Sequence, residues 1–397
     1  MSFERDVVIV GGCGRVGLPL GLALADAGMS VTLFDRDAHA VDQVRAGKMP
    51  FWEEGASTLL QGMIATDRFT ATIDPNAVGA AEHVVVVVGT PVDEHLNPDP
   101  KCVLSAIEGF IDQLHDGQHL VLRSTLYPGT TAMVERLLHS TGSAIDVSFC
   151  PERIAEGRAL EELRSLPQIV SARDDGAYKR AEDLFARLAP SIVRLEVEEA
   201  ELAKLFTNTW RYIKFAAANQ LFMIANDFGV DFARIRAALK HDYPRAADMP
   251  GPGLAAGPCL LKDTMQLAAF NNNNFTLGHA SMTINEGLPM YMVAQLERRY
   301  DLSALTVGIL GMAFKAESDD TRSSLSYKLK RLLRFRAERV LTTDPYVKND
   351  PELRSLDDVL AESDLLVIGA PHRRYADLEV AKPIVDVWNL LGHGERV

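Results

Sequence analysis

Residues 6–17 read DVVIVGGCGRVG, and this stretch decides the fold of the N-terminal half of the chain. The β-branched run at 6–10 predicts a buried strand. The glycines after it predict a tight turn, and the apolar pattern at 18–27 predicts a helix. A second predicted strand, 30–34, runs directly into Asp35. Strand, glycine turn, helix, strand and acid in this order are typical of a dinucleotide-binding βαβ unit, with an ordinary βαβ unit as the alternative.

The glycine turn also indicates how a cofactor would be held. A turn without side chains lets the backbone approach a pyrophosphate, and the helix N-terminus receives its charge. Asp35, 18 residues after Gly17, would accept hydrogen bonds from ribose hydroxyls and repel a 2′-phosphate. We therefore predict NAD as the cofactor, while Arg36 keeps NADP open as an alternative. The candidate cofactor residues are Gly12, Gly14, Arg15, Val16, Gly17, Asp35, Thr90, Pro91 and Thr125.

Apolar runs alternate with helical segments through the rest of the N-terminal half. Strands are predicted at 83–88, 119–123, 144–149, 168–172 and 192–195. Residues 37–73 are expected to be helical and rich in turns. The alternation predicts an α/β fold with a doubly wound parallel sheet, which binds ligands at the carboxyl ends of its strands. Three segments fall at such ends: Gly89–Pro91, Ser124–Thr125 and Pro151–Glu152. The position of Glu152 is explained equally well by a role in a site and by a role as a carboxylate in the first turn of a helix.

Residues 197–228 contain no helix breaker and predict one long helix. At about 30 residues it would span roughly 45 Å, more than a small domain needs. It is therefore expected either to bridge two domains or to pack against a partner chain. Lys204, Asn208 and Arg211 lie on one face of this helix, and such a face is more often solvated than part of a site.

Residues 255–263 read AAGPCLLKD and form the candidate centre of the chemistry. Cys259 precedes a predicted helix and lies near Lys262, so the local field favours its thiolate and suits it to act as a nucleophile. A single cysteine is more often a small buried apolar residue.

The last hundred residues repeat the βαβ pattern. Strands predicted at 306–310, 339–343, 364–369 and 383–387 indicate a second, smaller doubly wound domain. It has no GxGxxG motif, so any nucleotide there must be held differently. We predict three domains: a cofactor domain at 1–195, a central helical domain with the cysteine loop at 196–300, and a C-terminal domain at 301–397.

Composition narrows the class of protein. A formal net charge of -13 argues against nucleic acid as a partner, and no apolar run is long enough to cross a membrane. Four cysteines in 397 residues do not make a disulfide framework, and the first residues lead into a strand rather than a secretion signal. A cytoplasmic protein without a metal centre is expected.

The motifs together resemble those of the nucleotide-sugar 6-dehydrogenases, typified by UDP-glucose and GDP-mannose dehydrogenases. The resemblance covers nearly the whole chain, and the matching stretches are GCGRVGL at 12–18, GTP at 89–91 with NPD at 97–99, STL at 124–126, PER at 151–153 with EG at 156–157, ELAKLFTNT at 201–209, GPCLLKD at 257–263, and GMAFK at 311–315 with DDTR at 319–322. It implies two Rossmann-like domains joined by a long central helix, a helical dimerisation region, and a homodimer formed through that helix. The expected interface residues are Phe206, Trp210, Tyr212, Phe215, Leu221, Phe222 and Ile224.

The resemblance also implies a reaction. The family oxidises a primary alcohol to an acid in two hydride transfers to NAD. Cys259 would attack the intermediate aldehyde, and Lys204 and Asn208 would donate to the resulting oxyanion. Asp263 would hold a catalytic water, and Glu152, with Thr125 beside it, would be the base for thioester hydrolysis. The implied substrate-binding residues are Glu152, Glu156, Lys204, Lys262, Lys315 and Arg322.

The sequence departs from the family pattern in two places. The loop before the cysteine usually contains Gly-Gly, whereas Ala256 and Pro258 stand here, and Pro258 lacks a backbone N–H. An Arg is common after the last strand, where Trp388 stands. Both departures bear on the identity of the substrate more than on the type of reaction.

UDP-glucose is the leading substrate because the Lys262-Asp263 pair resembles the glucose and mannose branches. The same reaction on GDP-mannose or a UDP-N-acetylhexosamine is the alternative. A single-step hydroxy-acid dehydrogenase would need neither Cys259 nor a second doubly wound domain. A regulatory nucleotide-binding protein without catalysis would not need a nucleophile, oxyanion donors and a base together.

Overall fold

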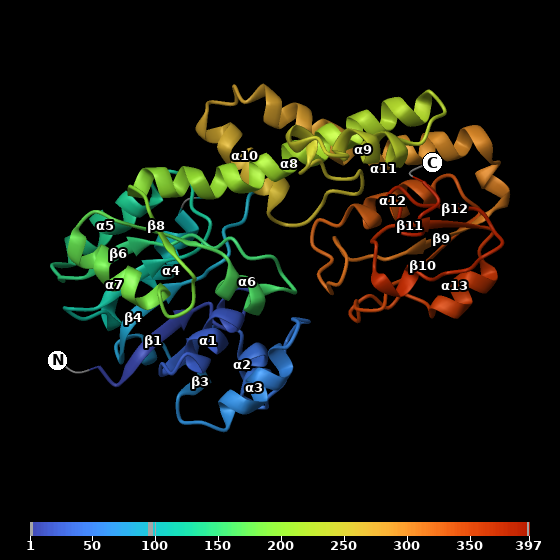
Figure 1. The fold of residues 1–397 in the computed structure, drawn as a ribbon. Helices are drawn as coiled ribbons and strands as arrows, with labels where there is room; N and C mark the ends of the chain where they lie inside the picture. Colours follow the sequence, from blue (N-terminus) through green and yellow to red (C-terminus); the bar gives the residue numbers. More distant parts are fainter. Residues whose placement is uncertain (1–2, 94–97, 100, 395–396) are drawn as a thin grey trace. The chain divides into compact units, whose positions relative to one another are not determined.

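The computed structural model describes residues 3–93, 98–99, 101–394 and 397. The chain forms two compact units, Met1–Thr207 and Asn208–Val397, and each is built around its own β-sheet (Figure 1). The division falls inside one long helix rather than at residues 195 and 300. The predicted three-domain boundaries therefore stay a prediction.

The N-terminal unit contains an eight-stranded sheet in the order β3-β2-β1-β4-β5-β6-β7-β8. The strands are β1 (Arg5–Val10), β2 (Val31–Phe34), β3 (Phe69–Thr72), β4 (Ala81–Val86), β5 (His119–Leu122), β6 (Asp146–Phe149), β7 (Gln168–Ala172) and β8 (Ile192–Arg194). Strands β1 to β6 are all parallel, which confirms the doubly wound prediction. Two details of the prediction are wrong. Strand β3 was expected to be helix or turn, and β7 pairs with β6 in antiparallel orientation.

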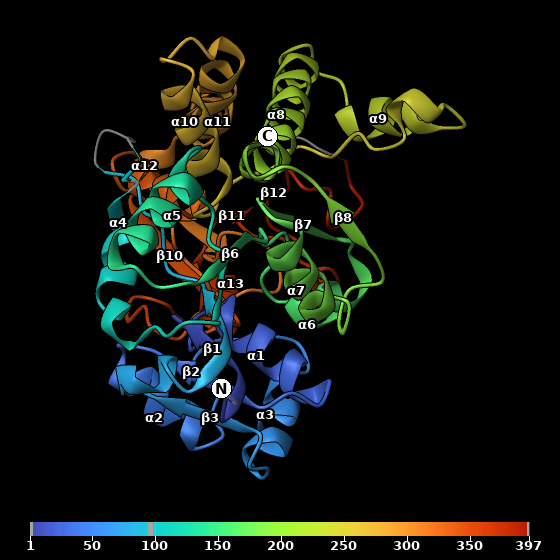
Figure 2. The same cartoon turned by 90° about the vertical axis from the view of Figure 1, so that its left-hand side faces the viewer.

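Helices cover both faces of this sheet. They are α1 (Gly17–Asp26), α2 (Ala38–Arg45), α3 (Ala56–Ile64), α4 (Lys101–Glu108), α5 (Thr130–Thr141), α6 (Ala159–Ser165) and α7 (Asp175–Phe185). Successive strand residues point to opposite faces, so Val7 and Ile9 pack with α1 while Val8 and Val10 pack with α4 and α5. Figure 2 shows α4 and α5 on one side of the strands and α6 and α7 on the other. Burial on both faces explains why the strands are continuous apolar runs.

The predicted long helix is confirmed as α8 (Val197–Asp227), drawn as one continuous ribbon in Figure 1. Glu201, near its start, is buried and accepts hydrogen bonds from the backbone N–H groups of Gly129 (2.6 Å) and Thr131 (2.9 Å). These N–H groups belong to the first turn of α5, where a carboxylate is favoured. Glu201 therefore attaches the first turns of α8 to the N-terminal unit.

The C-terminal unit contains the remaining helices and a four-stranded parallel sheet. The helices are α9 (Phe232–Lys240), α10 (Leu260–Phe270), α11 (Thr276–Arg299), α12 (Leu325–Arg334) and α13 (Leu356–Glu362). The strands are β9 (Thr306–Leu310), β10 (Arg339–Thr343), β11 (Leu365–Ile368) and β12 (Ile384–Val385), in the order β10-β9-β11-β12. Short 3₁₀ helices among the described residues are η1 (Pro75–Val78), η2 (Ile111–Gln113), η3 (Pro244–Ala246), η4 (Leu302–Ala304) and η5 (Arg373–Tyr375). The second doubly wound sheet is confirmed, and its apolar side chains face α12 on one side and α13 on the other.

No helix within the described ranges combines the length and the apolar character needed to cross a membrane.

Two buried histidines lie together near the amino ends of β4 and β5. His83 Nδ1 is 3.0 Å from His119 Nδ1, and His119 Nε2 is 2.8 Å from Ser148 Oγ. Burial lowers the pKa of His83 to about 4, and burial with the neighbouring charges lowers the pKa of His119 well below its usual value. Both rings are therefore neutral at pH 7, with one Nδ1 donating to the other. The charged groups that act on His83 are Glu82, Arg180, Asp6 and Arg187.

We expect the free energy of unfolding to decrease as the pH falls from about 6.5 toward 4. The folded pKa values of these histidines lie below the unfolded value, so the unfolded chain binds more protons in that window. Their contribution is fully present above the unfolded pKa, and the part due to His83 amounts to roughly 3 kcal/mol.

Urea midpoints measured between pH 7.5 and 4.5 check this expectation. Carboxylates also titrate in the lower part of the range, so the wild type is compared with a His83→Gln/His119→Gln variant. The wild type should lose stability more steeply than the variant below pH 6.5. Equal pH slopes in the two proteins would contradict the assignment.

Candidate active site

The glycine turn after β1 leaves no room for side chains at Gly12 and Gly17. A methyl group added at Gly12 would lie 2.6 Å from the Ile9 carbonyl oxygen, and one at Gly17 would lie 2.6 Å from the Gly11 carbonyl oxygen. Both contacts are too short, so α1 packs against the turn only because these residues are glycines. Gly14 is exposed and would meet nothing closer than 3.4 Å. The turn therefore packs tightly against the protein at Gly12 and Gly17, while its exposed side at Gly14 is free of side chains. A pyrophosphate could approach the backbone on that side.

Asp35 lies at the carboxyl end of β2 and is half-buried. Its Oδ2 accepts a hydrogen bond from the backbone N–H of Cys13 (3.0 Å), and its Oδ1 accepts one from that of Asp37 (3.1 Å). A carboxylate has about four acceptor positions, so two remain for ribose hydroxyls. Arg36 is exposed. The turn and Asp35 therefore fit the adenosine half of NAD.

The other predicted cofactor residues lie at the same edge of the sheet, because β1, β2, β4 and β5 are parallel. Thr90, Pro91 and Thr125 follow β4 and β5. Ser124 Oγ donates to the Val88 carbonyl oxygen over 2.7 Å and so joins the two loops. Val16 immediately precedes α1 and is half-buried. Asn97, in the matching NPD stretch, lies outside the described residues.

Two residues that were predicted to bind ligands, Arg15 and Glu156, form an ion pair with each other. Arg15 Nη1 is 4.0 Å from Glu156 Oε2, and both side chains are about one-fifth exposed. The Arg15 guanidinium also lies 5.0 Å from the centre of the Phe51 ring. Arg15 was predicted to bind cofactor and Glu156 to bind substrate, and their pairing places both at one spot within the N-terminal unit.

Glu152 follows β6 and is buried. Its Oε2 forms an ion pair with Arg123, and its Oε1 accepts hydrogen bonds from the backbone N–H groups of Arg153 (2.6 Å) and Ile154 (2.8 Å). Arg123 is itself buried, donates to the Cys150 carbonyl oxygen over 3.2 Å, and its guanidinium carbon lies 4.7 Å from the centre of the Phe185 ring. The carboxylate is therefore held rigidly at the carboxyl edge of the sheet.

Cys259 is the residue immediately before α10 and is exposed. Two other cysteines are unsuited to act as thiolates: burial, with Asp35 nearby, raises the pKa of Cys13 to about 12, and burial raises that of Cys150 to about 11. The fourth, Cys102, is half-buried on α4. The structure therefore offers Cys259 as the accessible thiol, at the end of a helix where a thiolate is favoured.

One turn into α10, Asp263 is fully buried. Its Oδ2 accepts a hydrogen bond from Asn208 Nδ2 over 2.5 Å, and its Oδ1 lies 2.8 Å from Lys262 Nζ. An amide nitrogen carries two hydrogens, so Asn208 keeps one that Asp263 does not use. Three predicted site residues thus meet beside the candidate nucleophile.

The spacing alone favoured a solvated face on α8, whereas the family resemblance assigned Lys204 and Asn208 to the site, and both are buried. Lys204 is 8% exposed and Asn208 is 6% exposed, whereas Arg211 is exposed. They are separated by four positions, so both project from the same side of the helix. This burial supports the alternative that the face belongs to a site.

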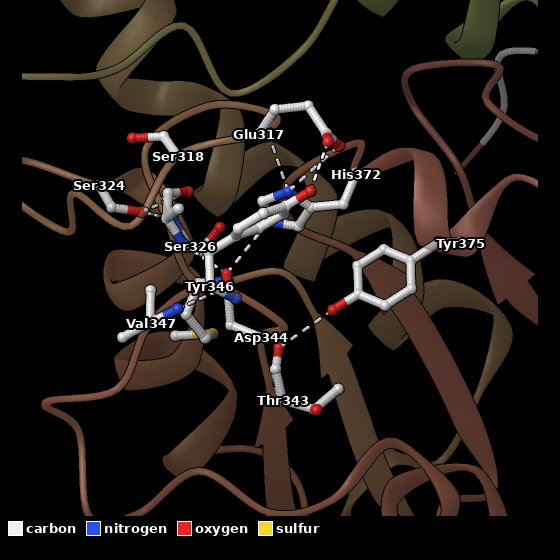
Figure 3. Close-up of polar contacts among 12 residues, drawn as sticks. Glu317, Ser318, Ser324, Ser326, Thr343, Asp344, Tyr346, Val347, His372 and Tyr375 are labelled. Atoms are coloured by element: carbon white, nitrogen blue, oxygen red, sulfur yellow. Dashed lines mark hydrogen bonds and ion pairs between the residues drawn. The ribbon is translucent and has the colours of Figure 1, made fainter. Parts of the chain in front are cut away.

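The carboxyl edge of the second sheet is organised by Asp344, at the end of β10 (Figure 3). Its Oδ2 accepts hydrogen bonds from the backbone N–H groups of Met312 (2.7 Å) and Ala313 (2.9 Å), and its Oδ1 accepts from those of Tyr346 (2.8 Å) and Val347 (3.1 Å). Asp344 corresponds in position to Asp35, but all its acceptor positions are occupied. It cannot bind a ribose as Asp35 can, which is the physical reason why the second domain must hold a nucleotide differently.

A fully buried histidine completes this cluster. His372 Nδ1 accepts a hydrogen bond from the Glu317 backbone N–H over 3.0 Å, and Nε2–H donates to Asp344 Oδ2 over 3.1 Å. Burial alone would raise the pKa of Asp344, but the bonds from His372 and the backbone hold it below its usual range. His372 thereby joins the loops after β9, β10 and β11. The sequence motifs did not single out His372, although a histidine in the loop after a predicted strand was an available signal.

The two predicted cations of this domain differ in their surroundings. Lys315 Nζ lies 5.8 Å from the centre of the Phe314 ring, at the loop after β9. Arg322 is paired with Asp320 (2.6 Å), and its side chain is 59% exposed. In the described ranges, no group of three or more His, Cys, Asp or Glu side chains is placed to hold a metal ion.

Comparison with known proteins gives the family. Three models of the UDP-glucose/GDP-mannose dehydrogenase family match in order: the NAD binding domain at 6–189, the central domain at 198–287 and the UDP binding domain at 308–393. The chain is 27% identical to the UDP-N-acetyl-D-mannosamine dehydrogenase of Methanococcus aeolicus, over 98% of this chain and 92% of that protein. It is 29% identical to the UDP-glucose 6-dehydrogenase of Haloferax volcanii, over 93% and 92%.

A solved structure is similarly close. The UDP-glucose dehydrogenase of Pyrobaculum islandicum superposes with a TM-score of 0.90 at 27% identity, covering 97% of this chain and 94% of that one. The resemblance seen in the motifs therefore extends to the whole fold. With all three domain models in place and the motif residues at the expected strand and helix ends, the chain belongs to the UDP-glucose/GDP-mannose dehydrogenase family.

Proposed function

We propose that this NAD-dependent nucleotide-sugar dehydrogenase oxidises the C6 alcohol of a UDP-linked hexose to the uronic acid, with Cys259 as the covalent nucleophile. The observation that carries the proposal is the exposed Cys259 at the start of α10, one turn from the buried Asp263–Asn208 pair. A protein that only bound nucleotides would not need an accessible thiol beside oxyanion donors.

The reaction requires two oxidations with a covalent step between them. When bound, NAD supplies the hydride acceptor, and the substrate alcohol loses a hydride and a proton to become an aldehyde. The Cys259 thiolate adds to the aldehyde carbon, and loss of a second hydride from the thiohemiacetal leaves a thioester. Water then cleaves the C–S bond, which releases the carboxylate and restores the thiol.

Side chains of the protein would stabilise the oxyanion, accept and donate protons, and bind the substrate during these steps. Asn208 has one amide hydrogen left after its bond to Asp263, and we assign that hydrogen, with the Lys204 ammonium, to the oxyanion. Asp263 would orient Asn208 and a water. Glu152 would serve as the base for thioester hydrolysis with Thr125 nearby, while Lys262, Lys315, Arg322 and Glu156 would contact the sugar diphosphate.

We also propose an order of preference among the candidate nucleotide sugars. We put UDP-glucose first because of the Lys262–Asp263 pair and the similarity to UDP-glucose dehydrogenases. UDP-N-acetyl-D-mannosamine is the second candidate, since several similar proteins bear that name. GDP-mannose is third. A cytoplasmic location stays a prediction from the few cysteines.

Counting NADH per sugar tests the proposal. UDP-glucose, UDP-N-acetylmannosamine and GDP-mannose are each incubated with excess NAD, and NADH and uronic acid are measured. We expect two NADH per uronic acid, with the highest kcat/KM for UDP-glucose. One NADH per sugar would indicate a single-step dehydrogenase, and none with any sugar would favour a regulatory protein. A higher kcat/KM for another sugar would change only the substrate.

We also propose that the protein forms a homodimer through α8. Apolar residues recur at spacings of three or four along one side of the helix and just past its end. Except for the half-buried Ile213, the large ones are strongly exposed, from 43% at Leu221 to 83% at Phe228. The stripe consists of Phe206, Trp210, Ile213, Ala217, Leu221, Ile224 and Phe228. Tyr212 and Phe222, which were also expected at the interface, are instead fully buried in their own chain. A second copy of the same helix is the occupant that a twofold axis would supply.

A Trp210→Glu/Ile224→Glu variant should be monomeric at micromolar concentration, because each charge would be buried in the interface without a partner. Sedimentation velocity measures the mass. Phe335→Glu is the control, since Phe335 is 81% exposed on a different helix end and should leave the mass unchanged. A monomeric wild type would contradict the proposal.

A further inference from the structure

The loop at 250–259, which leads into Cys259, is held tightly at Gly253. This glycine has φ +154°, donates its N–H to Asn219 Oδ1 (2.8 Å) and accepts from Asn219 Nδ2 (3.1 Å). The ring of Trp388 lies against it, so that an added methyl group would be 2.1 Å from Trp388 Cζ3. Only a hydrogen fits between this backbone and the indole.

A second aromatic ring holds the same loop at Gly257. This residue has φ +104°, and an added methyl group would lie 2.5 Å from Phe314 Cδ2. Its N–H donates to the Ser323 carbonyl oxygen over 3.3 Å. Only Pro258, whose ring fixes φ, separates this contact from Cys259, so a displacement at Gly257 is transmitted to the thiol.

Both rings are firmly supported. Trp388 follows β12, and its Nε1–H donates to the Ile368 carbonyl oxygen over 3.1 Å. Asn219, on α8, also donates to Asn285 Oδ1 over 2.9 Å. Phe314 follows β9, and its backbone N–H donates to the Asp320 carbonyl oxygen over 2.9 Å. The supports therefore come from the sheet and helices of the C-terminal unit.

We propose that Trp388 and Phe314 are positioning residues that clamp the loop at Gly253 and Gly257 and so place Cys259 for attack. The inference rests on the proposed function, because it takes Cys259 as the nucleophile. It also relates the two departures from the family pattern, since Trp388 lies against Gly253 and packs against the same apolar cluster as Ala256. Neither ring is assigned a contact with substrate.

Displacement of a nucleophile by about 1 Å can cost on the order of 100-fold in rate. We expect Trp388→Ala to lower kcat by at least tenfold and to leave the KM for NAD within twofold, because the NAD binding domain matches residues 6–189 and Trp388 lies outside it. Trp388→Phe should recover most of kcat, since a phenyl ring still covers Gly253. Phe314→Ala should behave like Trp388→Ala.

Alkylation of Cys259 by iodoacetamide, without NAD or sugar, gives a readout independent of turnover. Cys259 is already exposed, so its alkylation rate depends on where the loop holds the thiol rather than on access, and Trp388→Ala should change that rate at least threefold. Mass spectrometry assigns the modified residue. Cys13 and Cys150 are buried and should stay unmodified, whereas general unfolding would expose them as well.

Gly253→Ala tests the contact from the other side. Its methyl group must displace the indole, so this variant should also lower kcat, and adding Trp388→Ala should cost little more. If the losses of kcat in Gly253→Ala and Trp388→Ala instead multiplied in the double variant, the two residues would act independently and the proposed contact would be wrong. Phe335→Ala, which removes an exposed ring elsewhere in the same unit, should change neither kcat nor alkylation.

A folded Trp388→Ala protein with kcat and alkylation rate both within twofold of wild type would overturn the inference. Should Cys259→Ser retain uronic acid production, the proposed function would fail. The alkylation measurements would still show whether the two rings hold the loop, so the two failures are distinguishable.

Discussion

Cys259→Ser is expected to stop steady-state release of uronic acid, lowering it by at least about 1,000-fold. A serine hydroxyl is almost entirely protonated at neutral pH, so it adds to the aldehyde far more slowly than a thiolate. Any ester that does form would hydrolyse slowly. The variant should therefore accumulate aldehyde or a covalent adduct, which intact-protein mass spectrometry would detect after incubation with UDP-glucose and NAD.

Cys102→Ser is the matched control. Cys102 is the other cysteine that is not fully buried, and it lies on α4, outside the proposed nucleophile loop. Its replacement should leave two NADH per sugar and a rate within about twofold of wild type. Sustained, wild-type-like uronic acid production by Cys259→Ser would remove Cys259 from the mechanism.

Cofactor preference is expected to depend on the charge of Asp35. Wild-type kcat/KM should be at least about 100-fold higher for NAD than for NADP, since a 2′-phosphate would approach a carboxylate held at the end of β2. Asp35→Asn removes the repulsion and should reduce that preference at least tenfold. It should also weaken NAD binding, because the single amide oxygen cannot replace both the Oδ2 bond to Cys13 and the bonds to ribose.

Asp37→Asn provides the comparison for this measurement. Asp37 is two residues further on, and its Oδ1 accepts from the Ala40 backbone N–H at the start of α2, a cap that asparagine also makes. This variant should keep the wild-type ratio of NAD to NADP. If wild-type enzyme used NADP as well as NAD, Arg36 would be the determinant instead of Asp35.

Local sequence signals were enough to predict much of this fold. Strand β9 and helices α1 and α8 lie where their patterns place them, because burial on both faces makes continuous apolar strands and the lack of breakers lets one helix run for 31 residues. The glycine turn and Asp35 also follow from local order, since their spacing is that of one βαβ unit. The resemblance of short motifs was sufficient to indicate the family.

Features that depend on distant partners were missed. Strand β3 has four residues and pairs only at the sheet edge, so its alternation was too short to identify, and nothing local shows that β7 turns antiparallel to β6. Trp210 and Tyr212 are only two positions apart on α8, yet Tyr212 is fully buried and Trp210 is 58% exposed. The difference comes from which helices pack beside them.

The sequence by itself therefore determined the fold class, the cofactor turn and the candidate nucleophile, because each depends on residues close together in the chain. Only the tertiary structure decided that Asp344 is occupied while Asp35 has acceptor positions left, since five donors from three loops converge on Asp344. It likewise decided that Trp388 rests on Gly253, 135 positions away. Such contacts form when loops from separate strands meet at one sheet edge, and no local pattern encodes where another strand will lie.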